Sequence, residues 1–180
     1  MRALTFRVFL TGTPGVGKST VVRKMVQRIQ KDGMRVGGMT TADLRSGSAR
    51  VGFEIRNLMT GEVVVLAHIS RADGPRIGKY RVNSEDLDRI GTEGILSAIK
   101  HSDLIAIDEV GPMELTSHRF KDAVQAALAS GKPLLGTVHR NATDPLVQAI
   151  KADRTVEIVE VTHENRDSLP STLLERLTTR

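Results

Sequence analysis

The segment GTPGVGKS, residues 12–19, decides the fold class of this chain. It matches the pattern G-x-x-x-x-G-K-[ST], a glycine-rich turn whose backbone N–H groups cradle phosphate oxygens. The apolar run before it, residues 4–11, reads as a strand, and residues 18–31 read as a helix. This order suits phosphate binding, because the helix directs the positive end of its dipole at the anion. The segment therefore predicts a nucleotide site, but not what happens to the nucleotide.

Each position in the loop has a physical role. The glycines let the backbone approach phosphate closely, the Lys18 ammonium reaches the β- and γ-phosphates, and the Ser19 hydroxyl binds Mg²⁺. The expected nucleotide contacts are Gly12, Thr13, Pro14, Gly15, Val16, Gly17, Lys18, Ser19 and Thr20.

Short apolar runs alternate with helical segments along the rest of the chain, which predicts an α/β fold with a doubly wound, mostly parallel sheet. The expected further strands are 34–41, 50–58, 62–68, 103–109, 133–139 and 155–161. The expected further helices are 83–100, 117–130, 144–151 and one from about Leu169. Strands 50–58 and 62–68 read as an antiparallel hairpin inside an insertion of about 34–82. We expect residues 1–180 to form a single domain.

Composition narrows the class of protein. The chain has 180 residues, a net charge of +5 and no cysteine, so disulfides, thiolate metal sites and cysteine nucleophiles are excluded. The N-terminal segment does not read as a signal peptide, and no run is long enough to span a membrane. We expect a cytoplasmic monomer. The basic surplus suits an anionic partner, but dispersed cations, one tyrosine and no tryptophan disfavour nucleic-acid binding.

The run IAIDE supplies a second half of the site. Within residues 103–109, the four residues 104–107 are apolar and Asp108 and Glu109 follow them, which is typical of a buried parallel strand ending at the ligand edge of an open sheet. Asp108 is the expected Walker B acid and holds Mg²⁺. Glu109 is placed to orient and deprotonate a water in line with the γ-phosphate.

The next strand, 133–139, extends this site. Some P-loop NTPases carry a second acid after the Walker B acid and are of the RecA-like, additional-strand type. In these proteins, the strand that follows the Walker B strand in sequence inserts beside the phosphate-loop strand. That order would bring Thr137, His139 and Arg140 to the γ-phosphate edge. His139 would then bond the γ-phosphate or the attacking water, and Arg140 would stabilise transition-state charge.

Seven segments together resemble the small P-loop nucleoside-triphosphatase family known from thermophiles and from a cancer-related human relative. They are GTPGVGKST (12–20), GGMTTADLR (37–45), RVGF (50–53), IGKYRVN (77–83), IDEVGPMEL (107–115), GTVHR (136–140) and ENRD (164–167). The resemblance implies a P-loop fold and Mg²⁺-dependent hydrolysis of several nucleoside triphosphates to diphosphate and phosphate. The chain departs from the family pattern at Asp43, where a Glu is usual, and at Pro112, where a Lys is frequent.

Three further features have two interpretations each. Arg45 matches the family pattern and either faces the phosphates or anchors a hairpin through a salt bridge. Arg166 either stacks on the base without reading its edge, which would tolerate every base, or belongs to a helix-capping turn. The Gly- and Arg-bearing loop 72–82 either closes over the triphosphate or is a solvated basic loop.

The sequence thus favours a Mg²⁺-dependent phosphatase that acts on ATP, GTP, CTP and UTP with low base specificity. A small-molecule or nucleotide kinase and a nucleotide-dependent RNA- or protein-binding module remain as alternatives. A guanine-specific N-K-x-D motif is absent from the sequence, which disfavours a signalling GTPase.

Overall fold

The computed structural model of the protein describes residues 6–179, and within them nine strands form one sheet. The strands are β1 (Arg7–Thr11), β2 (Val36–Ser46), β3 (Ala49–Asn57), β4 (Val63–His68), β5 (Arg76–Ile77), β6 (Tyr80–Val82), β7 (Leu104–Val110), β8 (Leu134–Val138) and β9 (Glu157–Glu160). The α-helices are α1 (Lys18–Lys31), α2 (Ser84–Asp86), α3 (Glu93–His101), α4 (His118–Ala129), α5 (Pro145–Ala152) and α6 (Leu169–Thr178). A π-helical segment, η1 (Leu87–Thr92), joins α2 to α3, and a 3₁₀ turn, η2 (Glu114–Thr116), precedes α4.

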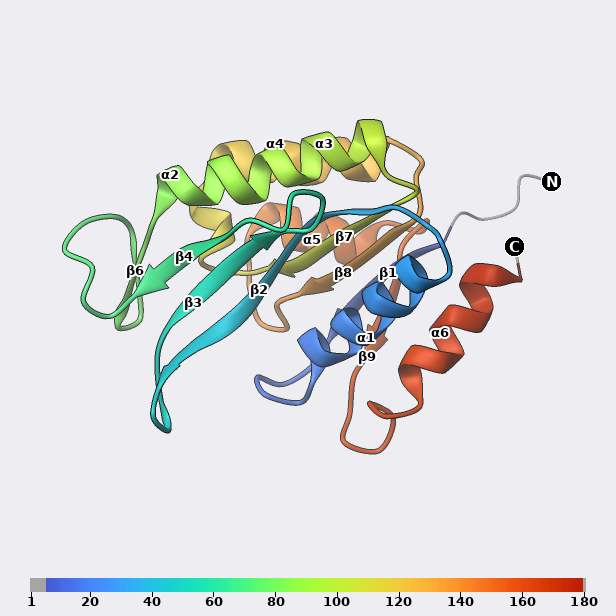
Figure 1. The fold of residues 1–180 in the computed structure, drawn as a ribbon, viewed down its shortest axis with the longest axis horizontal. Coiled ribbons are helices and arrows are strands. Elements are labelled where there is room, and N and C mark those ends of the chain that lie inside the picture. The colour runs from blue at the N-terminus through green and yellow to red at the C-terminus, as the bar shows by residue number, and fades with distance from the viewer. Residues whose placement is uncertain (1–5, 180) are drawn as a thin grey trace.

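Helices cover the parallel part of the sheet on both faces, which confirms the predicted fold class (Figure 1). One face carries α3, α4 and α5, whose apolar side chains join a core with Phe9 of β1 and Ile107 of β7. The opposite face carries α1 and α6, whose side chains meet Val8 and Leu10 of β1. Alternate residues of β1 therefore enter two different cores, as the period of two in a strand requires.

The sheet runs in the order β5-β6-β4-β3-β2-β7-β8-β1-β9. As predicted, the strand that follows the Walker B strand, β8, lies between β7 and β1 and is parallel to both. All five residues of β8 are buried. This insertion places the carboxyl end of β8 between the phosphate loop and the end of β7.

The antiparallel part is larger than the sequence predicted. The hairpin of β3 and β4 is present, but β2 extends to Ser46 and also pairs antiparallel with β3 over its second half. The predicted loop 72–82 contains the small β5–β6 hairpin, which continues the sheet from β4. The predicted helix from Asn83 is confirmed with Asn83 as its N-cap, although its second segment is the π-helical η1.

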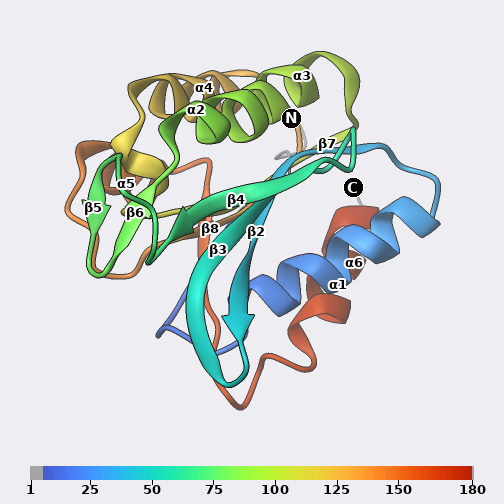
Figure 2. The same cartoon turned by 60° about the vertical axis from the view of Figure 1, so that its left-hand side comes forward.

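The β2–β3 hairpin projects beyond the rest of the sheet. Figures 1 and 2 both place its tip at the edge of the sheet where the loop before α1 lies. Among residues 6–179, no helix has the length and apolar character needed to cross a bilayer.

Candidate active site

The loop between β1 and α1 has the backbone shape that its glycines predict. Gly12 has a φ of 148°, and a Cβ atom there would lie 2.7 Å from the carbonyl oxygen of Val161. Gly17, with a φ of 117°, begins α1, and no side chain within the described residues caps that helix. The first N–H groups of α1 are therefore left to an external acceptor, which is the arrangement that binds phosphate at helix N-termini.

Lys18 lies over this loop. Its ammonium donates hydrogen bonds to the carbonyl oxygens of Gly12, at 3.1 Å, and Thr13, at 3.4 Å. Ser19 and Thr20 are exposed beside it on the first turn of α1. The loop thus presents one cation and two hydroxyls at the carboxyl edge of the sheet.

Asp108 is buried at the end of β7, with 2% of its surface exposed. Its Oδ1 accepts a hydrogen bond of 2.6 Å from the hydroxyl of Thr137 on β8. Burial raises the pKa of Asp108 to about 6, and the charge of Glu109 adds to this, whereas the hydroxyls of Thr137 and Ser19 and the charge of Lys18 oppose it. Asp108 is therefore close to the first turn of α1, as a Walker B acid must be.

Glu109 follows Asp108 through a cis peptide bond and is partly buried. Burial raises the pKa of Glu109, and the charge of Lys18 acts in the opposite direction. A Cβ atom on Gly111 would lie 2.6 Å from Glu109 Oε1, so the glycine leaves room for this carboxylate. The carboxylate is thus in the electrostatic field of the phosphate-loop lysine.

A third carboxyl group, Glu114, belongs to the same cluster, and the sequence reasoning gave it no role. Glu114 lies on η2 and is 5% exposed. Burial raises its pKa to about 8, and the charges of Glu109 and Asp108 add to the effect. Its position between Met113 and Leu115 was the available signal, because an acid flanked by apolar residues is often buried with them.

His139 lies directly after β8. Partial burial lowers its pKa, and the charges of Lys18 and Lys151 lower it further, so the ring is neutral near pH 7. Its Nδ1 accepts a hydrogen bond from the backbone N–H of Asn141 at 3.2 Å. The neutral ring therefore carries its proton on Nε2, which is the nitrogen free to donate.

Arg140 turns away from β7 towards β9. Its guanidinium is 3.3 Å from the carboxylate of Glu160, which is paired with Thr11 at the end of β1. Arg140 thus spans the carboxyl end of β1, beneath the phosphate loop. Its predicted contact with transition-state charge stays a prediction, and it requires Arg140 to exchange this exposed ion pair for the phosphate.

Arg166 contacts the phosphate loop from the β9 side. Its guanidinium donates to the carbonyl oxygen of Val16 at 3.3 Å, and its aliphatic stem lies near Gly17. The preceding residue, Asn165, organises the turn: its side chain accepts from the N–H of Thr162, and its carbonyl oxygen accepts from the N–H of Leu169. Asn165 thus orders the turn before α6, and the stacking of Arg166 on a base stays a prediction.

Arg45 lies in the tip of the β2–β3 hairpin. Its guanidinium bonds the carboxylate of Asp43 at 3.1 Å and the carbonyl oxygen of Ser48 at 2.9 Å. Arg50 also pairs with Asp43. This is the hairpin-anchoring salt bridge, and a contact of Arg45 with phosphate stays a prediction.

The donor set fits a magnesium ion held jointly with a nucleotide. Within residues 6–179, no group of three or more His, Cys, Asp or Glu side chains is arranged to hold a metal ion alone. Ser19 and Asp108 instead offer a hydroxyl and a carboxylate on neighbouring elements. Mg²⁺ prefers oxygen ligands and is commonly held by one or two side chains together with phosphates and water. A dication would also offset the burial of the Asp108 charge.

Comparison with known proteins finds relatives that match nearly the whole chain. A family model described as NTPase matches residues 7–174. The nucleoside-triphosphatase THEP1 of Methanosarcina acetivorans is 44% identical over 171 residues, covering 94% of this chain and 95% of the relative. The protein of the same name from Methanosarcina barkeri is 46% identical over 171 residues, covering 94% and 96%.

Two solved structures share the fold along nearly the whole chain. The crystal structure of THEP1 from the hyperthermophile Aquifex aeolicus superposes with a TM-score of 0.86 at 29% identity, covering 96% of this chain and 99% of that one. The solution structure of a human cancer-related nucleoside triphosphatase gives 0.82 at 31% identity, covering 97% and 98%.

Proposed function

The chain belongs to the NTPase family, whose curated relatives are nucleoside-triphosphatases, and we propose that it hydrolyses ATP, GTP, CTP and UTP with Mg²⁺ and little base specificity. One observation carries the proposal. The two acids at the end of β7 lie at the same edge of the sheet as the phosphate loop, because β7, β8 and β1 are parallel neighbours. This arrangement supports a base for water and a cradle for triphosphate at one edge of the sheet.

In the proposed reaction, the N–H groups of residues 12–19 and the Lys18 ammonium bind the β- and γ-phosphates. Ser19 and Asp108 would hold Mg²⁺, which neutralises charge on the phosphate oxygens when bound. Glu109 orients a water and takes its proton as the water oxygen attacks the γ-phosphorus. The bond to the bridging oxygen breaks, and a nucleoside diphosphate and phosphate are formed.

His139 and Arg166 have supporting roles in this proposal. His139 is neutral with its proton on Nε2, so it donates a hydrogen bond to the γ-phosphate or to the water. Arg166 lies against Val16 and Gly17, on the side of the loop away from His139, and its flat guanidinium stacks on a base without reading its edge. This contact supports low base specificity.

The test is phosphate release from each of the four triphosphates, with Mg²⁺ and no added acceptor. Glu109→Gln keeps the shape of the side chain but removes the base, so we expect kcat to fall about 10²- to 10⁴-fold. Binding of Mg²⁺·ATP, followed by calorimetry, should be retained. Glu175→Gln, at an exposed glutamate on α6, is the matched control and should match the parent. Comparable kcat in Glu109→Gln and parent would refute the assignment of the base.

A further inference from the structure

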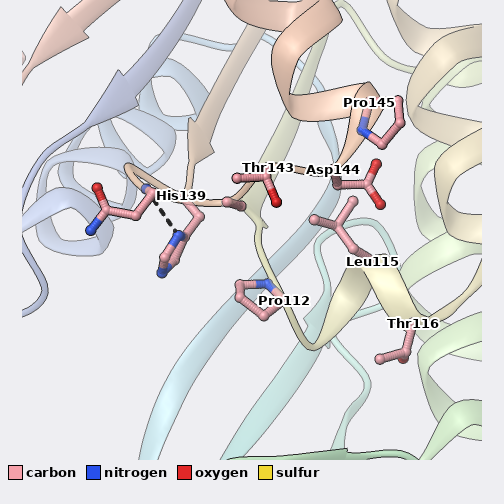
Figure 3. Close-up of a pocket in the computed structure, with 9 residues that line it drawn as sticks. Pro112, Leu115, Thr116, His139, Thr143, Asp144 and Pro145 are labelled. Carbon is pink, nitrogen blue, oxygen red and sulfur yellow. Dashed lines mark hydrogen bonds between the residues drawn. The ribbon is translucent and has the colours of Figure 1, made fainter.

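An open pocket lies among the residues that follow the ends of β7 and β8. It has a volume of about 600 Å³, within the usual range for small-molecule sites. Figure 3 shows His139, Thr143, Leu115 and Pro112 arranged around it. Of the residues that line it, His139 alone has a role in the hydrolysis proposed above.

The cavity begins where the catalytic strands end. Pro112 lies three residues after Glu109, and His139 lies two residues after Thr137, the residue that bonds Asp108. The wall formed by His139 is also within the electrostatic field of Lys18. The cavity therefore lies at the carboxyl edge of the sheet, which is the edge that carries the phosphate loop and Glu109.

The cavity carries no uncompensated charge. Burial alone would raise the pKa of Asp144, but bonds from Lys121 and from the N–H of Leu146 hold it below its ordinary value. The two carboxylate oxygens of Asp144 are both occupied, by Lys121 at 2.6 Å and by Leu146 N–H at 2.9 Å. His139 is neutral. The occupant favoured by these walls is therefore an uncharged molecule.

The polar groups that remain are hydroxyl and amide groups. The Thr143 hydroxyl and the Asn141 carboxamide form no hydrogen bond with any other residue from 6 to 179, and both residues are exposed. Apolar surface comes from Pro112, Leu115 and Pro145. This combination suits a neutral ring compound that carries hydroxyl groups, up to about the size of a nucleoside.

We propose that this cavity is an acceptor site, in which the hydroxyl group of such a compound replaces water as the nucleophile. The inference rests on the proposed function, because it uses the same triphosphate and the same base. The acceptor oxygen forms a bond to the γ-phosphorus as the bond to the bridging oxygen breaks. The hydroxyl proton passes to Glu109, and the products are a nucleoside diphosphate and a phosphomonoester.

The test is the distribution of phosphate between water and alcohols. The enzyme is incubated with Mg²⁺·ATP and, in separate samples, an excess of ribose or of each of the four ribonucleosides, and the products are distinguished by ³¹P NMR. We expect the parent to form phosphomonoester at the expense of inorganic phosphate with at least one of these compounds. Formation of inorganic phosphate alone in every sample overturns the acceptor site while leaving hydrolysis intact.

A variant that fills the cavity tests whether the phosphate acceptor binds there. Thr143→Trp should lower phosphomonoester formation by at least about tenfold, because the indole occupies the space of the acceptor. Release of phosphate without acceptor should stay within about twofold of the parent, since Thr143 lies outside the hydrolytic machinery. Thr172→Trp, at an exposed threonine on α6, is the matched control and should form the phosphomonoester normally. Equal phosphomonoester formation by Thr143→Trp and parent would overturn the placement, whereas loss of acceptor-free phosphate release in the parent would refute the proposed hydrolysis itself.

Discussion

At the scale of single residues, the site is a cluster of buried carboxyl groups with one cation opposite. Burial raises the pKa of each of Asp108, Glu109 and Glu114, and Lys18 acts against this shift at the first two. Buried charges are costly unless they are paired or hydrogen-bonded. The hydroxyls of Thr137 and Ser19 therefore offset part of the cost of burying Asp108.

Replacement of Thr137 by Val removes this hydroxyl and keeps the shape of the side chain. Thr137 is fully buried and donates the 2.6 Å bond to Asp108. We expect the free energy of unfolding to fall by about 1–3 kcal/mol, because a buried acceptor loses its donor. The Mg²⁺ concentration needed for half-maximal phosphate release should rise, since Asp108 is no longer held in place. Denaturant unfolding and a Mg²⁺ titration measure the two effects.

Thr137→Ser is the control for this prediction because it retains the hydroxyl group. It should remain close to the parent in its Mg²⁺ dependence. A Val variant with the Mg²⁺ dependence of the parent would show that Thr137 does not position Asp108.

Sequence reasoning identified residues whose role follows from backbone shape or from position at a strand end. The loop glycines, Lys18, Asp108 and Glu109 are of this kind, and the structure places them at one edge of the sheet. The sequence did not predict the burial of Glu114 or the ion pair of Arg140 with Glu160. The ion pair joins segments 20 residues apart, which no local pattern encodes, whereas the burial of Glu114 had only the weak signal of its apolar neighbours.

At the scale of elements, β8 joins the two halves of the site. Its register pairs Gly136 with Phe9 of β1 on one side and with Ile107 of β7 on the other. A Cβ atom on Gly136 would lie 2.4 Å from the Phe9 ring, so the glycine allows that ring to cover the strand. The spacing of β1 and β7 therefore depends on the absence of a side chain at Gly136, in the strand between them.

Gly136→Ala should lower the free energy of unfolding by about 1–3 kcal/mol, because the added methyl overpacks the core against Phe9. Phe9→Leu should relieve part of this loss in the double variant, giving a favourable coupling of at least about 0.5 kcal/mol. Urea unfolding of the four proteins of this cycle measures it. Strict additivity of the two changes would contradict the proposed contact.

Gly131→Ala is a useful comparison, because Gly131 has a φ of 71° and no atom lies near its missing Cβ. Its cost should be about 1 kcal/mol, from backbone conformation alone. It should show no coupling to Phe9.

Strands and helices of the parallel half were predictable because each is a long apolar run or a periodic segment. The second half of β2 and the β5–β6 hairpin were not. Their residues are mixed polar and charged, and they become strands by continuing the hydrogen-bond ladder of β3 and β4. Tyr80 of β6 is buried against Phe53 of β3, with ring centroids 5.1 Å apart. That contact exists only in the folded sheet, so the sequence around Tyr80 read as a loop.

At the scale of the whole molecule, buried acids make stability depend on pH in an unusual direction. The pKa values of Asp108 and Glu114, about 6 and about 8, lie above their ordinary values, so the folded state binds these protons more tightly than the unfolded state. The contribution of these two acids to the free energy of unfolding is complete below about pH 4. It is lost as the pH rises through the two pKa values of the folded state. The pKa values of Asp103 and Asp153 are lowered, and their contributions are lost only in stronger acid.

The protein with EDTA and without nucleotide should therefore lose stability between about pH 5 and about pH 9, by about 2 kcal/mol or more. Glu114→Gln should flatten the part of this curve above about pH 6, because its amide does not ionise. Guanidinium unfolding at several pH values measures both curves. Parent stability that is constant or rising over this interval would contradict the burial of the two acids as ionisable groups.

The position of β1 has a consequence for how the chain acquires its activity. Both strands that pair with β1, β8 and β9, come from the last third of the sequence. During synthesis the phosphate loop emerges early, yet its supporting strand has no neighbour until residues 134–138 and then 157–160 leave the ribosome. Contacts of such large sequence separation close late and slowly. A nascent chain therefore carries a complete binding motif before its active site has formed. It cannot hydrolyse cellular triphosphate until its own translation is nearly finished.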